Sequence, residues 1–263
     1  YHVGGVIQDR DALLLQTPDS LQARFAIDVR VNTEASSIDT EARTVLITDA
    51  ITGASSTLEY DELVLSPGSR LRSTIDTGDV AAFPLRTIDE MDAIIAALER
   101  VEQSGRRPRV AVVGAGFIGL EAVENLHARG AEVTIVQASP QVLGPLDIEM
   151  TAPILTALRD AGIDVRLSTT VDGGAGDGLI LSDGTRLPAD LAIVAPGVAP
   201  ETSLAADAGV RLGAGGGIVV DASHRTSAAH VWAIGDAALK TDAIDGEGLI
   251  VSMAGLANRH GRE

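Results

Sequence analysis

The stretch VAVVGAGFIGLE, residues 110–121, joins an apolar run to a helical pattern through three glycines spaced as G-x-G-x-x-G. Gly114 permits a tight turn, Gly116 leaves no side chain to block a pair of phosphates, and Gly119 allows the helix to pack close to the strand. The N–H groups at the start of the helix then face an anion, and the helix dipole favours negative charge there. The spacing therefore predicts a turn that binds a dinucleotide pyrophosphate.

Strand and helix patterns alternate on both sides of this turn. Upstream, Thr87 and Glu90 have the spacing of a capping box before a helix. Downstream, two helices are expected to close at Gly130 and Gly162. The expected helices cover residues 88–101, 117–129 and 148–161. The expected strands cover residues 109–114, 132–136, 163–169 and 191–197, with a hairpin at 179–190 that turns at Asp183-Gly184. This alternation predicts an α/β domain with a parallel sheet over residues 82–197.

Gln137 stands at the end of the second strand, where NAD-binding proteins carry an acidic residue for the ribose hydroxyls. A glutamine can hydrogen-bond a diol but has no charge to repel a 2′-phosphate, so Gln137 leaves the choice between NAD and NADP open. No arginine pair follows in Ala138-Ser139-Pro140, which favours NAD. The alternative role for Gln137 is a solvated strand end.

Composition limits the classes of function. The chain of 263 residues is 45% hydrophobic and 2% aromatic with 28 glycines, which is typical of an α/β protein. A net charge of −17 disfavours general binding to nucleic acid or anionic membranes, and no apolar stretch reaches the roughly 20 residues of a membrane span, so we expect a cytoplasmic protein. The absence of cysteine excludes thiolate metal sites, disulfides and a thiol nucleophile in this chain, and the histidines lack metal-ligand spacing, so no metal site is predicted.

The two flanks of this region have a different pattern. Residues 1–81 read as short strands and turns, and residues 24–59 predict an antiparallel β-meander that runs into a buried strand at 63–65. Residues 198–263 return to short pieces, with strands expected in GGGIVVD and HVWAIGD. The first flank, residues 1–81, contains no complete βαβ unit.

Seven segments form a recognisable set: YHVGGVI (1–7), LLLQTPDSLQARFAIDVRVN (13–32), YDELVLSPGS (60–69), VVGAGFIGLEAVENL (112–126), LAIVAPGVAPET (191–202), RTSAAHVWAIGDA (225–237) and MAGLANRHGR (253–262). Together they resemble the motifs of the FAD-dependent pyridine nucleotide-disulfide oxidoreductases, in particular the group that holds coenzyme A-disulfide reductases, NADH oxidases and NADH peroxidases. The resemblance covers nearly all of the chain, and the chain looks truncated at both ends relative to that family.

The resemblance implies a Rossmann-like NAD(P)-binding domain, residues 82–197, inserted in a partial FAD-binding domain made of residues 1–81 and 198–263. Asp236 of the Gly-Asp-Ala motif would hydrogen-bond the ribityl chain of FAD. The turn at 66–69 would lie close to the FAD diphosphate, although Pro67 departs from the Ala-Thr-Gly-Ser pattern of the family. The implied FAD contacts are Ala35, Ser66, Gly68, Gly235, Asp236 and Ala254.

The resemblance also extends the expected nucleotide site. Gly197 would let the nicotinamide half of the cofactor approach. Glu121 aligns with a glutamate near the flavin ring and nicotinamide, and its alternative role is a surface carboxylate. The expected NAD(P) contacts are Gly114, Gly116, Phe117, Ile118, Gly119, Gln137 and Gly197.

The activity implied by the resemblance is hydride transfer from NAD(P)H to FAD and on to a disulfide, with coenzyme A disulfide favoured by QTPDSLQARF. Relatives carry a redox cysteine in Asn-Cys-x-x-Pro directly before a tyrosine like Tyr1, and because this chain has no cysteine we expect it to be inactive alone. The alternatives are an NADH oxidase or peroxidase, or a non-catalytic NAD(P)H-binding fragment. A homodimer is expected for the full-length parent.

Overall fold

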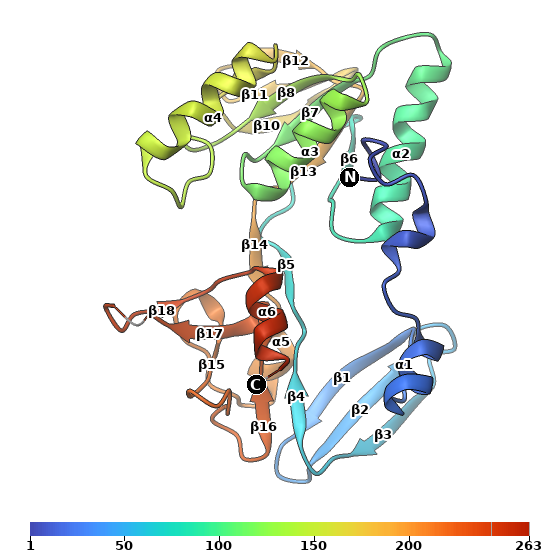
Figure 1. The fold of residues 1–263 in the computed structure, drawn as a ribbon, viewed down its shortest axis with the longest axis vertical. Helices are drawn as coiled ribbons and strands as arrows, with labels where there is room; N and C mark the ends of the chain where they lie inside the picture. Colours follow the sequence, from blue (N-terminus) through green and yellow to red (C-terminus); the bar gives the residue numbers. More distant parts are fainter. Residues whose placement is uncertain (243, 263) are drawn as a thin grey trace. The chain divides into compact units, whose positions relative to one another are not determined.

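The computed structural model describes residues 1–242 and 244–262 (Figure 1). Residues 243 and 263, which fall in the second expected FAD segment, lie outside the described residues. The chain forms two compact units: unit 1 contains Tyr1–Leu14 and Leu71–Gly197, and unit 2 contains Leu15–Arg70 and Val198–Glu263. Packing thus places residues 1–14 and 71–81 with the glycine-rich turn, whereas the sequence boundaries grouped them with residues 15–70.

A five-stranded parallel sheet forms the centre of unit 1. Strands β7 and β13 lie in its middle and are almost fully buried, which explains their continuous apolar sequences. The sheet order is β6 (Ala81–Phe83), β13 (Leu191–Val194), β7 (Arg109–Val113), β8 (Glu132–Val136) and β9 (Asp164–Arg166). All four pairings are parallel, so the predicted α/β fold with a parallel sheet is confirmed.

Three helices accompany this sheet: α2 (Ile88–Gln103), α3 (Phe117–Ala128) and α4 (Ile148–Asp160). The predicted capping box starts α2, because the Glu90 N–H donates to Thr87 Oγ1 at 3.2 Å and the Thr87 N–H donates to Glu90 Oε2 at 2.9 Å. Side chains of α2 and α3 pack with those of the sheet in one core; its fully buried members include Ile94, Leu98, Leu126, Val112, Ile135 and Ile193.

An antiparallel sheet of β10 (Val171–Ala175), β11 (Gly178–Leu181) and β12 (Arg186–Pro188) completes unit 1. Strands β11 and β12 form the predicted hairpin, and Gly184 takes a φ of +78° in its turn, a backbone conformation that favours glycine.

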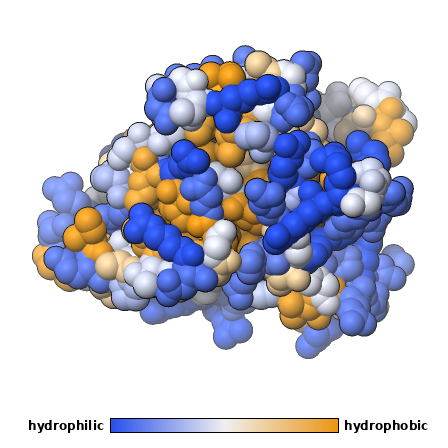
Figure 2. Space-filling model, turned by 90° about the horizontal axis from the view of Figure 1, so that it is seen from above, coloured by the Kyte–Doolittle hydropathy of each residue, from blue (hydrophilic) through white to orange (hydrophobic). Residues whose placement is uncertain are grey.

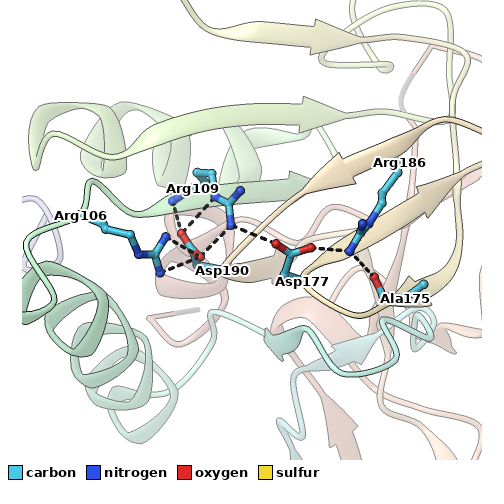
Figure 3. Close-up of polar contacts among 6 residues, drawn as sticks. All are labelled: Arg106, Arg109, Ala175, Asp177, Arg186 and Asp190. Carbon is cyan, nitrogen blue, oxygen red and sulfur yellow. Dashed lines mark hydrogen bonds and ion pairs between the residues drawn. The ribbon is translucent and has the colours of Figure 1, made fainter.

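An ion-pair network joins this hairpin to the amino end of β7 and β13 (Figure 3). Asp190, whose side chain is 8% exposed, accepts hydrogen bonds from the Arg109 N–H at 2.9 Å and the Arg109 guanidinium at 3.1 Å. Arg106 adds a contact to Asp190 at 3.3 Å, while Asp177 pairs with Arg109 and Arg186. Burial alone would raise the pKa of Asp190, but the hydrogen bonds from Arg109 hold it below its ordinary value.

Unit 2 contains the predicted meander: β1 (Thr33–Asp39), β2 (Thr44–Asp49) and β3 (Ser55–Glu59) pair antiparallel. Strand β4 (Leu63–Leu65) pairs parallel with β16 (Val231–Ala233); only Leu65 of β4 is buried, so the expected buried strand is partly exposed. The other strands are β14 (Val198–Pro200), β15 (Ile218–Val219), β17 (Ala238–Thr241), β18 (Gly248–Leu249) and β5 (Ser69–Leu71), whose last residue belongs to unit 1. A second core gathers apolar residues of these elements, among them Ile38, Val45, Leu65, Ile218, Val231 and Ala233.

Helices in the flanks correct the sequence interpretation, which assigned only short strands and turns to residues 1–81. Helix α1 (Pro18–Phe25) overlaps the residues read as the first strand, which begins at Thr33 instead. Thr17 caps α1, with Pro18 in its first turn and a reciprocal Ser20 contact, and the helix ends before the β-branched residues that start at Ile27. The remaining helical segments are η1 (Arg10–Leu13), α5 (Ser203–Asp207), η2 (Ala214–Gly216), η3 (Gly235–Ala237) and α6 (Ala254–His260).

The surface is mixed in polarity. Figure 2 shows a face on which hydrophobic residues gather toward the middle with hydrophilic residues around them. Large apolar side chains that are exposed include Phe117, Ile148, Met150 and Met253. Among the described residues, no helix has both the length and the apolar character that crossing a bilayer requires.

Candidate dinucleotide and flavin sites

The turn between β7 and α3 contains the three glycines of the fingerprint. Gly114 has a φ of +108°, and a Cβ added there would lie 2.0 Å from the Ala195 carbonyl oxygen. A Cβ on Gly119 would lie 2.0 Å from the Gly114 carbonyl oxygen. A Cβ on Gly116 would meet no described atom within 4 Å. Gly114 and Gly119 therefore serve the packing of the turn, whereas Gly116 faces open space that a phosphate can enter.

Three strands of unit 1 end at this turn. The Gly114 N–H donates to the Val136 carbonyl at the end of β8, and the Ala195 N–H, just past β13, donates to the Val113 carbonyl. Gly197 follows with a φ of +96°. Ligands of open α/β sheets bind outside the carboxyl ends of such strands. The structure thus brings Gly114, Gly197 and the end of β8 to one edge of the sheet.

The start of α3 has the properties of an anion site. Gly116 is its N-cap and provides no side-chain cap, so the N–H groups of the first turn have no partner from a capping side chain. Phe117 and Ile118 follow directly and are 59% and 42% exposed. The twelve-residue helix places the positive end of its dipole at the same point. The arrangement fits a bound pyrophosphate.

Gln137 is bound to the turn through its side chain and does not extend as a solvated strand end. Its Oε1 accepts from the Ala115 N–H at 2.9 Å, and its Nε2 donates to Ser139 Oγ at 2.5 Å. The side chain thereby joins the end of β8 to the middle of the Gly-x-Gly turn.

Glu121 lies one turn into α3, exposed, and lines a cavity of about 340 Å³ in unit 1. The cavity is mostly apolar, and the other polar groups in its wall include His2 and Asn125. Ile118 lines the same cavity, so a residue of the nucleotide turn and the Glu121 carboxylate share one space. The role of Glu121 near flavin and nicotinamide stays a prediction.

The expected FAD contacts all belong to unit 2. Ser66 follows β4 and Gly235 follows β16, and because these strands pair in parallel their carboxyl ends meet: the Ile234 N–H donates to the Leu65 carbonyl at 3.0 Å. The Asp236 carboxylate accepts a hydrogen bond from Ser69 Oγ at 3.1 Å. The Gly-Asp-Ala turn and the 66–69 turn are therefore neighbours, as a shared diphosphate and ribityl site requires.

The other FAD candidates stand on separate elements of unit 2. Gly68 has a φ of +75° and its carbonyl accepts from the Glu201 N–H, which fixes the turn. Ala254 is the exposed first residue of α6. Ala35 is exposed on β1 beside a register shift between Ala35 and Ser37. Their contacts with a flavin stay predictions.

Two residues that sequence reasoning missed hold the Gly-Asp-Ala turn. Lys240 Nζ donates to the carbonyls of Gly235 and Ala238 at 2.5 and 2.9 Å, and burial lowers its pKa while the Asp236 carboxylate opposes that shift. His260 Nδ1 accepts from the Gly235 N–H at 3.3 Å. Lys240 lies outside any motif, and no spacing in the sequence links His260 of the MAGLANRHGR segment to Gly235. Across residues 1–242 and 244–262, no group of three or more His, Cys, Asp or Glu side chains is placed to hold a metal ion.

A family profile described as pyridine nucleotide-disulphide oxidoreductase matches residues 3–256, which is nearly the whole chain. The chain belongs to this family. It is 31% identical over 238 residues to a coenzyme A disulfide reductase of Staphylococcus aureus, a match that covers 90% of this chain and 53% of the relative. FAD and NAD(P)H are the cofactors that this family uses.

Solved structures of family members have the same fold. The reduced CoADR-RHD of Bacillus anthracis superposes with a TM-score of 0.94 at 36% identity, covering 100% of this chain and 47% of that one. A NAD-dependent persulfide reductase from A. fulgidus superposes with a TM-score of 0.91 at 31% identity, covering 100% of this chain and 50% of that one. The chain thus spans about half the length of the relatives that it matches.

Proposed function

We propose that this chain provides the NAD(P)H site and part of the FAD site of a flavoprotein that passes hydride from NAD(P)H to FAD and on to a disulfide. The observation that carries the proposal is the open space at Gly116, between two glycines whose Cβ atoms would collide with backbone. A turn that only reversed the chain would need the flanking glycines but not a third one facing open space. The proposal includes the domain plan expected from the sequence, in which residues 82–197 bind NAD(P) and residues 1–81 and 198–263 form parts of an FAD-binding domain.

Each unit supplies one set of groups. In unit 1, the N–H groups of the first turn of α3 face the pyrophosphate, and Gly197 leaves room for the nicotinamide half. In unit 2, one Asp236 oxygen accepts from Ser69 while the other can accept a ribityl hydroxyl. When bound, the nicotinamide supplies the hydride and the flavin accepts it. The residues of this chain bind and orient; the Glu121 carboxylate is the titratable group that we place closest to the reacting rings.

The acceptor that we favour is coenzyme A disulfide. Both the curated relative from Staphylococcus aureus and the Bacillus anthracis structure bear the name of that activity, and the persulfide reductase also acts on sulfur. Arg24, in the last turn of α1, is exposed and could contact an acceptor phosphate. A thiol-based step needs a cysteine, which this sequence lacks, so we propose that this chain alone binds nucleotide without turnover. For the full-length parent we propose a cytoplasmic homodimer.

The test has a binding part and a turnover part. NADH binding to the purified chain is measured by the change in nicotinamide fluorescence, and FAD binding by quenching of Trp232, the sole tryptophan, which lies three residues before Gly235. We expect micromolar NADH binding and weaker FAD binding. Absence of NADH binding by folded protein would refute the proposal.

Turnover is tested on the full-length parent. Anaerobic addition of NADH should bleach the visible flavin absorbance, and NADH consumption should then follow added coenzyme A disulfide with release of free thiol. Consumption that follows oxygen or hydrogen peroxide and ignores the disulfide would establish the oxidase or peroxidase alternative instead.

A further inference from the structure

A chain of uncharged hydrogen bonds folds the loop after β8 onto the glycine turn; we call residues 137–147 the β8 loop. Ala115 N–H donates to Gln137 Oε1, and Gln137 Nε2 donates to Ser139 Oγ and, at 3.3 Å, to the Gln141 carbonyl. Ser139 Oγ in turn donates to the Gln141 carbonyl at 2.8 Å. Every group in this chain is neutral.

Further contacts fix the shape of the β8 loop. Gln141 Nε2 donates to the Leu146 carbonyl at 2.7 Å, and the Leu143 N–H donates to the Ala115 carbonyl at 2.8 Å. Val142 and Leu143 are buried in unit 1. The loop is therefore held against the turn at both Ala115 backbone groups, and its polar side chains have set partners before any ligand arrives.

The β8 loop contains no lysine or arginine, and its one charged residue is Asp147. The cation beside it in the sheet is Arg166 on β9, whose carbonyl accepts from the Gln137 N–H. The Arg166 guanidinium is directed to Asp164, at 2.8 Å. A 2′-phosphate carries close to two negative charges at neutral pH, and without a cationic partner its loss of hydration is not offset.

We propose that the Gln137–Ser139–Gln141 hydrogen-bond chain makes this site selective for NAD(H) over NADP(H). The inference rests on the proposed function, because it needs a dinucleotide at the glycine turn. The Gln137 carboxamide oxygen accepts one hydrogen bond from Ala115 and has a second lone pair for a ribose hydroxyl. A neutral diol meets neutral polar groups here, whereas a phosphate meets carbonyl oxygens and no cation.

The experiment measures the dissociation constants of NADH and NADPH for the purified chain by nicotinamide fluorescence, at low and at high salt. We expect NADPH to bind at least tenfold more weakly than NADH. Ser139→Arg places a guanidinium in the β8 loop, and the ratio of the NADPH dissociation constant to the NADH dissociation constant should fall at least tenfold. The gain in NADPH affinity should shrink at high salt because the new contact is ionic.

Two control variants separate charge from structure. Ser139→Ala breaks the hydrogen-bond chain without adding charge, so NADH should bind more weakly while NADPH gains no affinity. Thr156→Arg adds the same charge on the exposed side of α4 and should leave both dissociation constants unchanged. Equal binding of NADH and NADPH by the unaltered chain overturns the inference while the proposed function stands. Binding of neither nucleotide overturns both.

Discussion

Gly116→Ala should leave the fold intact and remove most of the dinucleotide affinity. Gly116 has φ −79° and ψ −171°, which alanine adopts without strain, and its added Cβ meets no described atom within 4 Å. Alanine gains about 0.4–1 kcal/mol by restricting the unfolded chain and loses several tenths as an N-cap, so the free energy of unfolding should change by less than about 1 kcal/mol.

The affinity loss follows from where that methyl group points. It occupies the space that we assign to the pyrophosphate, so at least one N–H to phosphate hydrogen bond is lost, at about 1.5–3 kcal/mol. The dissociation constant of NADH should therefore rise about 10- to 100-fold. Nicotinamide fluorescence titration gives the affinity, and thermal denaturation on the same samples gives the stability.

Gly114→Ala is the matched control. Its φ of +108° and its 2.0 Å approach to the Ala195 carbonyl oxygen predict a loss of about 2–5 kcal/mol from backbone strain and overpacking. At about 2–4 °C per kcal/mol, Tm should fall clearly, in contrast to Gly116→Ala. The reasoning fails if folded Gly116→Ala binds NADH like the unaltered chain, or if the two variants lose the same stability.

Three further perturbations test other parts of the structure. Asp190→Asn should lower the free energy of unfolding by about 2–3 kcal/mol because Arg109 loses a buried charged acceptor. Because the folded pKa of Asp190 is depressed, its stabilisation is present above the ordinary carboxyl pKa and is lost as pH falls through the folded value. Stability measured by urea unfolding should therefore depend less on pH in that acid range for the variant than for the unaltered chain. Lys240→Met should weaken FAD binding about tenfold with Lys240→Arg restoring part of it, because the carbonyls around Asp236 lose their donor; unchanged Trp232 quenching by FAD would contradict this. Thr87→Ala should cost about 1 kcal/mol by removing the N-cap of α2, measured by thermal unfolding against Thr87→Ser, which keeps the hydroxyl.

Local patterns predicted the elements that short-range physics specifies. The continuous apolar runs of β7 and β13 reflect burial on both faces, and the capping box at Thr87 starts α2 where the sequence placed it. The same capping rule, applied to Thr17 and Pro18, would have predicted α1. The segment was instead interpreted as the start of a strand because β-branched residues follow Ala26. The sequence thus predicted whether a segment is a helix or a strand wherever capping residues or hydrophobic periodicity gave a clear local signal.

Contacts between segments that are distant in the sequence could not be predicted from local patterns. Gln137 and Ala115 are 22 residues apart, and Lys240 and His260 reach Gly235 from different elements. No spacing rule in the sequence links these residues, because their proximity depends on how strands and helices pack. The placement of residues 1–14 in unit 1 likewise depends on tertiary packing and could not be predicted from the sequence.

The sequence by itself determined the parallel sheet, the glycine turn and the absence of cysteine, because periodicity, the lack of a Cβ and composition are properties of the chain. The tertiary structure alone decided which carbonyl oxygen crowds Gly114 and where the Gln137 amide is directed. Both depend on atoms brought together from separate strands, because Ala115, Gln137 and Ala195 are far apart in the sequence.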